Sequence, residues 1–163
     1  MIRAARHDDA TAIAEIYAHY IEHTVVTFEE QPVGADAIRS RMGDLESGLP
    51  WLVCEQDGKV IGYAYASEWN GRCAYRHSAE VSVYLDHREV GRGIGMRLYS
   101  QLLDDLRARS FHTVIGGVAL PNAASVALHE KLGFEKVAHF SEVGWKFEKW
   151  IDVGYWQLTF GEQ

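Results

Sequence analysis

The sequence has few cysteines, few prolines and no long apolar run, and each of these shortages excludes a class of protein. Two cysteines in 163 residues, Cys54 and Cys73, are too few for a disulfide framework, so we expect both to be reduced in a cytoplasmic protein. Three prolines and no Ser/Gly-rich stretch leave no visible linker, which favours a single domain over residues 1–163. No stretch has the apolar length of a signal peptide or a membrane span, so we expect no membrane partner.

The sequence also lacks an excess of basic residues. Its formal net charge is −7, which argues against a nucleic-acid binder because such proteins present a basic face. This charge leaves room for a local phosphate site, since the field at one loop can differ from the global field. Arg88, Arg92 and Arg97 flank a glycine-rich loop, although composition alone favours placing them on the solvated surface.

The hydrophobic pattern predicts a chain of strands and helices, with 47% hydrophobic residues for the core. An early hairpin followed by alternating helices and strands is typical of a mixed sheet covered by helices. We expect strands at 2–5, 79–85, 112–120, 134–147 and 151–160, a hairpin over 51–67 that turns at Asp57-Gly58, and helices at 9–23, 34–47, 93–109 and 122–134, the last closed by Gly133.

Three glycines at alternate positions, Gly91, Gly93 and Gly95, stand between a predicted strand and a predicted helix. Their spacing matches neither the G-x-G-x-x-G pattern of dinucleotide-binding folds nor the G-x-x-x-x-G-K-[ST] pattern of a P-loop. A helix start still offers unpaired N–H donors and a partial positive charge. The residues alone leave two interpretations open: a phosphate or pyrophosphate on the backbone from Gly91 to Met96, or a tight turn that binds nothing.

Several segments together resemble the GNAT superfamily of N-acetyltransferases, and within it the phosphinothricin and methionine sulfone/sulfoximine acetyltransferases. The resemblance rests on "AYRHSAEVSVYL", "VGRGIGMRL", "LPNAASVALHEKLGF" and "GWKFEKWIDVGYWQL" in this order. It implies the GNAT acyl-CoA N-acyltransferase fold, an α/β (α+β) architecture with a mixed, mostly antiparallel central sheet flanked by helices. It also implies acetyl-CoA as co-substrate, a small amino-acid-like substrate acetylated on its α-amine, and a homodimer.

The resemblance places acetyl-CoA along one strand, the glycine loop and the helix that Asn122 begins. One departure is Val90, where family members usually have Gln or Arg, so a side-chain phosphate contact from this position is in doubt. The implied cofactor-binding residues are Val83, Tyr84, Leu85, Gly91, Arg92, Gly93, Ile94, Gly95, Met96, Asn122 and Ser125.

Two residues are candidates for the proton transfers that amide formation requires. Taken alone, Glu80 is a strand-end carboxylate and His129 a packing or surface histidine. The resemblance implies that Glu80 is the general base, acting through water. It makes His129 either the acid for the leaving thiolate or a base for the amine, and the sequence leaves both roles open.

Substrate contacts are implied around the same strand. Strand alternation puts Glu80, Ser82 and Tyr84 on the face that looks into the cleft, and Val81 with Val83 and Leu85 on the other. Arg72 is the candidate for binding the substrate carboxylate, because Arg forms two parallel hydrogen bonds with it. The full set of implied substrate-binding residues is Phe28, Glu29, Arg72, Tyr75, Glu80, Val81 and Ser82.

We expect no metal, because His19 and His23 lie at helical spacing without an evident third ligand. Two rival functions remain: acetylation of another amine, such as a protein N-terminus or a polyamine, and a non-catalytic acyl-CoA sensor. For the expected dimer, the candidate contacts are the six aromatic residues Trp145, Phe147, Trp150, Tyr155, Trp156 and Phe160.

Overall fold

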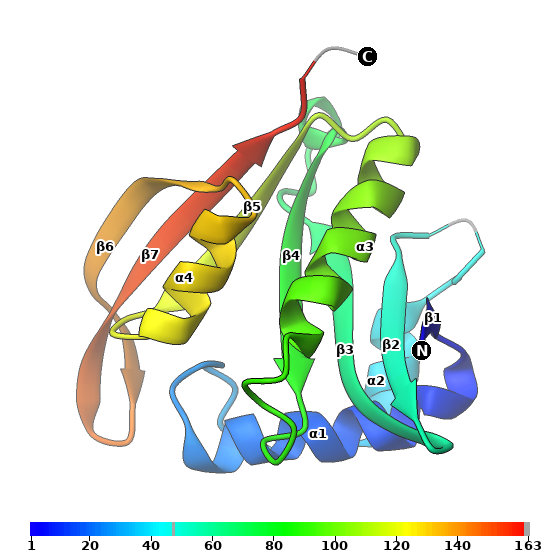
Figure 1. The fold of residues 1–163 in the computed structure, drawn as a ribbon. Helices are drawn as coiled ribbons and strands as arrows, with labels where there is room; N and C mark the ends of the chain where they lie inside the picture. The colour runs from blue at the N-terminus through cyan, green and yellow to red at the C-terminus, as the bar shows by residue number, and fades with distance from the viewer. Residues whose placement is uncertain (47, 162–163) are drawn as a thin grey trace.

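The computed structural model describes residues 1–46 and 48–161, and within these ranges seven strands form one sheet (Figure 1). The strand order is β1-β2-β3-β4-β5-β7-β6, and every neighbouring pair is antiparallel except β4 and β5. The mixed, mostly antiparallel sheet predicted from the sequence is confirmed. The strands are β1 (Ile2–Ala4), β2 (Trp51–Gln56), β3 (Lys59–Glu68), β4 (Ser78–Leu85), β5 (Thr113–Ala119), β6 (Glu135–Lys146) and β7 (Lys149–Thr159).

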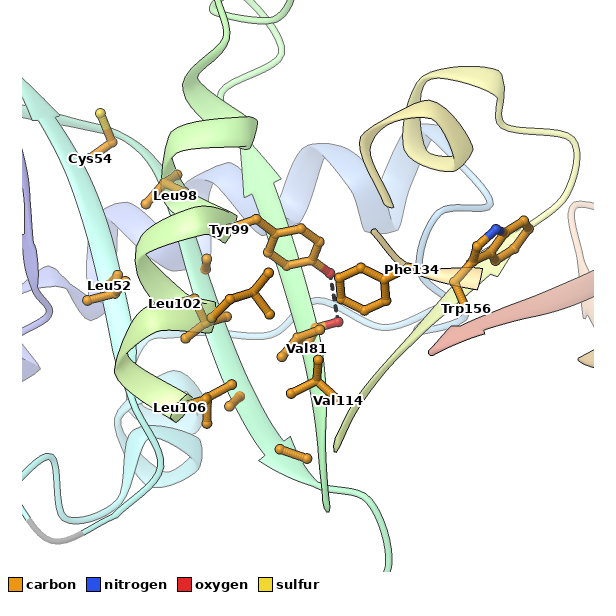
Figure 2. Close-up of a cluster of buried hydrophobic side chains, with 14 of the residues drawn as sticks. Leu52, Cys54, Val81, Leu98, Tyr99, Leu102, Leu106, Val114, Phe134 and Trp156 are labelled. Atoms are coloured by element: carbon orange, nitrogen blue, oxygen red, sulfur yellow. Dashed lines mark hydrogen bonds between the residues drawn. The ribbon is translucent and has the colours of Figure 1, made fainter. Parts of the chain in front are cut away.

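Helices cover both faces of the sheet, and each face has its own hydrophobic core. The helices are α1 (Ala10–His23), α2 (Ala35–Met42), α3 (Ile94–Ala108) and α4 (Ala123–Lys131). On one face, α1 and α2 pack Ile13 and Ile38 against Trp51. On the other face, α3 packs Leu98 and Leu102 against the strands, as Figure 2 shows. None of the described helices is long and apolar enough to cross a membrane.

The helix predicted over 34–47 is the one element whose extent is clearly wrong. It begins at Ala35 and ends at Met42, and residue 47 lies outside the described residues. Gly43 ends the helix because its φ of +58° is a left-handed conformation that favours glycine. Its N–H still bonds to the Arg39 carbonyl at 3.2 Å, so the last helical turn is closed there.

The parallel strands β4 and β5 separate part of the way along their length (Figure 1). They pair only at Ser78 with Thr113, Ala79 with Val114 and Glu80 with Ile115. Beyond these pairs, β4 continues to Leu85 with a strand partner on the β3 side alone among the described strands. An open strand edge therefore faces the gap between β4 and β5.

Candidate active site

The open edge of β4 presents the backbone groups of every second residue. The Asp86 N–H donates to the Ile61 carbonyl at 2.9 Å, so by antiparallel alternation the backbone of Tyr84 pairs with β3. The backbone groups of Val83 and Leu85 point the other way, toward the gap. The expectation that Tyr84 offers its backbone to a ligand is therefore wrong, whereas Val83 can offer both its N–H and its carbonyl.

Side chains already use two carbonyls on this edge. The Tyr99 hydroxyl donates to the Val81 carbonyl at 2.9 Å, and the Tyr20 hydroxyl donates to the Leu85 carbonyl at 2.6 Å. These two bonds confirm independently that Val81 and Leu85 direct their carbonyls away from β3. Val83 lies between them, and its backbone groups have no strand partner on this side within the described part of the chain.

The glycine loop leads directly into α3 with the geometry of an anion site. Gly91 and Gly93 have φ values of +79° and +73°, which glycine adopts without the strain that a side chain would bring. The first backbone bond of the helix runs from the Arg97 N–H to the Gly93 carbonyl at 3.2 Å. The amides at 94–96 precede this bond, so they are the unpaired N–H groups of a helix N-terminus.

Asp86 organises this loop, and the sequence analysis missed it. Its buried carboxylate accepts hydrogen bonds from the Arg88 backbone N–H at 3.1 Å and from the Arg88 guanidinium at 2.9 and 2.7 Å. The Arg88 contacts hold the pKa of Asp86 well below its usual range. Arg92 likewise pairs with Glu89, so both arginines bond within the protein. The sequence did contain a signal for Asp86, because this acidic residue directly follows the predicted strand 79–85.

Helix α4 packs beside the start of α3. Asn122 caps α4, since its side-chain oxygen accepts the Ser125 N–H at 3.1 Å. A Cβ built on Gly95 would lie 3.8 Å from a methyl group of Leu128. The first turn of α3 therefore packs against α4, and the Asn122 side-chain oxygen is already used by the cap.

Glu80 faces a hollow of about 270 Å³ on the α1/α2 side of the sheet. Burial raises the pKa of its carboxyl above the usual range. Phe28 lies in the wall as expected, and Tyr155, from β7, is a wall residue that the sequence analysis had given to the dimer contact. The hollow is lined by Val26, Phe28, Glu80, Gly117, Ala119, Val143, Val153 and Tyr155.

His129 lies on the other face of the sheet from Glu80. Neighbouring strand residues point to opposite faces, and in β5 a Cβ on Gly117 would meet Tyr155, whereas one on Gly116 would overlap the His129 ring. His129 is 3% exposed. Burial lowers its pKa, partly opposed by the hydrogen bond with the Ser125 carbonyl. The sheet therefore separates the two predicted catalytic residues.

Four predicted substrate contacts lie away from the Glu80 hollow. The Val81 side chain is buried in the α3 core, so this side chain does not face the Glu80 hollow. Glu29 is bound by Arg41 and Tyr17, which fixes its loop to α1 and α2. Arg72 and Tyr75 line a second hollow of about 290 Å³ with Arg76.

Ser82 lies on the Glu80 face of β4, opposite Tyr65 of β3. Across residues 1–46 and 48–161, no group of three His, Cys, Asp or Glu side chains gathers where it could hold a metal ion.

An open strand edge, a helix N-terminus for phosphates and a half-buried carboxylate define a transferase site for an elongated, phosphate-bearing acyl donor. Residues 2–154 match the acetyltransferase (GNAT) domain family. The chain therefore belongs to the GNAT family of N-acetyltransferases, and the fold and activity that the resemblance implied are confirmed.

Individual relatives agree over almost the whole chain. A phosphinothricin N-acetyltransferase from Streptomyces viridochromogenes is 39% identical over 98% of this chain and 87% of its own. An L-methionine sulfoximine/L-methionine sulfone acetyltransferase from Salmonella typhimurium is 37% identical over 99% of this chain and 95% of its own. A solved acetyltransferase from Salmonella typhimurium with its cofactor acetyl-CoA has a TM-score of 0.96 and 36% identity, covering 100% of this chain and 95% of its own.

Proposed function

We propose that this protein transfers the acetyl group of acetyl-CoA directly to the α-amine of a small amino acid or analogue, of the phosphinothricin or methionine sulfoximine/sulfone type. The observation that supports this most is the half-buried Glu80, whose raised pKa suits a base, at a hollow beside the open edge of β4. The hollow is of a size for a small molecule. The names of two full-length relatives supply the substrate class.

Each part of the site has a role in this proposal. The amides at 94–96 and the left-handed Gly91 and Gly93 hold the pyrophosphate, and the Val83 backbone pairs with the pantetheine arm as an added strand would. The Val83 N–H polarises the thioester oxygen. Glu80 accepts the amine proton through a water molecule, since an amine must lose a proton as the amide forms.

Arg72 remains the proposed ligand for the substrate carboxylate, although it lines the second hollow. Its loop connects with the Glu80 hollow through Trp69, whose ring makes an edge contact with Tyr155 at 5.8 Å between centroids. An arginine presents a planar fork that matches a carboxylate. No arginine lines the Glu80 hollow itself among the described residues, so the carboxylate ligand must come from a neighbouring loop.

The proposal includes a homodimer in the cytoplasm. Trp145, Phe147 and Trp150 are each at least 50% exposed on the β6–β7 hairpin, and Phe140 and Val143 of β6 are also exposed. Such exposed aromatics favour an interface. Both cysteines are free thiols, which suits a reducing compartment.

The deciding experiment measures acetyl-CoA turnover over a panel of amines. We expect acetylation of phosphinothricin, methionine sulfoximine or methionine sulfone, and little acetylation of a polyamine or of a peptide N-terminus. Preference for the last two would favour the rival substrate class. Binding of acetyl-CoA by calorimetry without turnover of any amine would favour the acyl-CoA sensor. Glu80→Gln serves as the control for enzyme-dependent transfer.

A further inference from the structure

Tyr99 on α3 and His129 on α4 belong to a chain of three hydrogen-bond contacts. The Tyr99 hydroxyl bonds to the Val81 carbonyl (Figure 2) and lies 3.2 Å from His129 Nε2. His129 Nδ1 lies 2.7 Å from the Ser125 carbonyl oxygen. Both ends of this chain of contacts are carbonyl oxygens, which accept hydrogen bonds and cannot donate them.

The number of hydrogens decides which protonation state suits these contacts. Three contacts need three hydrogens. The Tyr99 hydroxyl supplies one and a neutral imidazole supplies one, so a neutral His129 leaves one contact without a hydrogen. An imidazolium supplies two, with Nδ1–H donating to Ser125 and Nε2–H donating to the Tyr99 oxygen. Only the protonated form of His129 completes the chain of contacts.

Packing holds the ring where these contacts form. A Cβ on Gly116 would lie 2.8 Å from His129 Cδ2 and even closer to Nε2, so β5 passes directly beneath the imidazole. Phe134 makes an edge contact with the ring at 5.2 Å between centroids. Because β5 and Phe134 restrain the ring on two sides, His129 is held with Nε2 toward Tyr99.

Burial is the main force against a charged His129, and few charged groups lie close. Burial lowers its pKa, whereas the Ser125 contact raises it, and no charged side chain contributes to the shift. Two uncharged residues pack on the ring, Gly116 from β5 and Trp156 from β7. The titratable group in contact with it is Tyr99 on α3, whose pKa is raised by burial. The charged side chains on the surrounding elements are Glu130 on α4 beside the Trp156 indole, Lys136 on β6 over the Trp156 ring, and Glu80 across the sheet.

We propose that Tyr99 is a further catalytic residue, which links a protonated His129 to the open edge of β4 and passes the proton to the leaving sulfur. This rests on the acetyl transfer proposed above. The Val81 carbonyl that binds Tyr99 is two residues from Val83 on the same edge, about 7 Å along the strand. The Tyr99 hydroxyl therefore lies near the place assigned to the thioester.

The proton transfers balance in this scheme. As the carbon–sulfur bond breaks, the electron pair stays on sulfur. The Tyr99 hydroxyl turns its single hydrogen from the Val81 carbonyl toward the sulfur, and this proton moves to the sulfur to give the thiol. The Nε2 proton of His129 moves to the Tyr99 oxygen, and the imidazolium becomes neutral. Glu80 takes one proton from the amine nitrogen on the other face of the sheet. One proton leaves nitrogen and one reaches sulfur, so His129 is an acid and not a base.

The test follows the ring nitrogens of His129 by NMR in ¹⁵N-histidine-labelled wild type and Tyr99→Phe. The proposal requires the contacts with Tyr99 and Ser125 to outweigh the effect of burial on the pKa of His129. We therefore expect both nitrogens of the wild-type ring to be protonated at about pH 7, and the titration midpoint to fall by about one pH unit or more in Tyr99→Phe. A wild-type ring that is neutral at this pH, or equal midpoints in the two proteins, would overturn the proposal. This readout needs no turnover, so it stands apart from any failure of the proposed function.

Kinetics and two further variants complete the test. Tyr99→Phe should lower kcat by ~10–100-fold and shift the alkaline limb of its pH profile to lower pH, with acetyl-CoA affinity unchanged. Gly116→Ala should displace the ring and lower the His129 midpoint likewise. Tyr20→Phe also removes a hydroxyl bound to a β4 carbonyl, but one that bonds to no histidine, and should leave the midpoint unchanged. The proposal would also be contradicted by an unchanged alkaline limb in Tyr99→Phe. A fall of the His129 midpoint in Tyr20→Phe as large as that in Tyr99→Phe would contradict it as well.

Discussion

At the scale of single residues, environment decides what each carboxylate can do. Glu80 and Asp86 lie near the two ends of β4; Asp86 is buried and Glu80 is half-buried. Asp86 has an arginine partner and its pKa is lowered, whereas burial alone raises the pKa of Glu80. The charged Asp86 carboxylate holds its loop through Arg88, whereas the Glu80 carboxylate, with its raised pKa, can take up a proton.

Glu80→Gln should lower kcat by ~10²–10⁴-fold and leave acetyl-CoA affinity nearly intact, because the amide cannot accept the amine proton. Wild-type activity should rise with pH through the raised pKa of Glu80, since the base must be deprotonated. That acidic limb should disappear in the variant. Steady-state pH profiles and calorimetry check this, with exposed Glu135→Gln as the matched control. A wild-type kcat and profile in Glu80→Gln would reduce Glu80 to a strand-end residue.

Arg72→Ala should raise the KM for the amino acid by ~10–100-fold with a smaller change in kcat, because a carboxylate ligand acts in both the ground and transition states. Arg76→Ala is the matched control. Arg76 lines the same hollow, but its guanidinium donates to the Cys73 carbonyl at 3.0 Å. Equal KM values for wild type and Arg72→Ala would remove Arg72 from the substrate site.

At the scale of elements, the start of α3 depends on two left-handed glycines and on the Asp86–Arg88 pair, and it presents unpaired amides. The left-handed glycines let the chain turn from β4 into α3, and the turn leaves the first amides of the helix unpaired. The Asp86–Arg88 pair holds the loop from the strand side. The helix N-terminus is a ready anion site only because these features coincide.

Gly93→Val should weaken acetyl-CoA binding by at least ~10-fold while changing the amine KM little, because the side chain would crowd the pyrophosphate. Gly43→Val is the matched control. Both glycines have a positive φ and open space around a built Cβ. Gly93 has ψ 7° and lies in the αL region, whereas Gly43 has ψ −141°, so the control variant carries the greater backbone strain. Calorimetry on folded protein measures the affinity. Equal acetyl-CoA affinity in the Gly93 variant and the wild type would show that the loop does not hold the co-substrate.

Asp86→Asn should lower the melting temperature by about 3–6 °C at neutral pH, because the amide cannot replace the paired carboxylate. The pKa of Asp86 is lower in the folded state than the ordinary value of about 3.9. Its stabilisation is therefore complete above about pH 4 and is lost as the pH falls through the folded pKa. Thermal unfolding at about pH 7 and about pH 3 should show the difference from wild type shrinking in acid. A difference that stays constant would contradict the ion-pair explanation.

At the scale of the whole molecule, the β6–β7 hairpin changes the expected dimer contact. Trp156 and Phe160 are buried in the core, so the expectation that these two residues reach a partner is wrong. Tyr155 lines the Glu80 hollow. Trp145 and Trp150 pack on each other at 4.6 Å between centroids and remain 50% and 63% exposed.

Light scattering at micromolar concentration should give about twice the chain mass of 18.4 kDa. A Trp145→Ser/Trp150→Ser double variant should give the monomer mass, because it removes the aromatic centre of the exposed surface. Val90→Ser removes an exposed apolar side chain elsewhere and should leave the mass unchanged. A monomeric wild type would exclude the dimer.

The sequence by itself determined the elements, the glycine loop and the chemistry of the individual residues. Periodicity predicted the strands and helices, and glycine spacing predicted the helix N-terminus, because both depend on residues close together in the chain. The extent of α2 was misjudged because a left-handed Gly43 outweighs the apolar residue Leu45 that follows it.

Only the tertiary structure decided which residues meet. Phe28 and Val143 line one hollow from distant parts of the chain, and Glu80 and His129 lie on opposite faces of the sheet. Tyr99 reaches the β4 edge because α3 packs across it. Strand alternation is local and can be predicted, but strand order, the separation of β4 from β5 and the packing of helices on each face depend on contacts between distant segments, which no local pattern specifies.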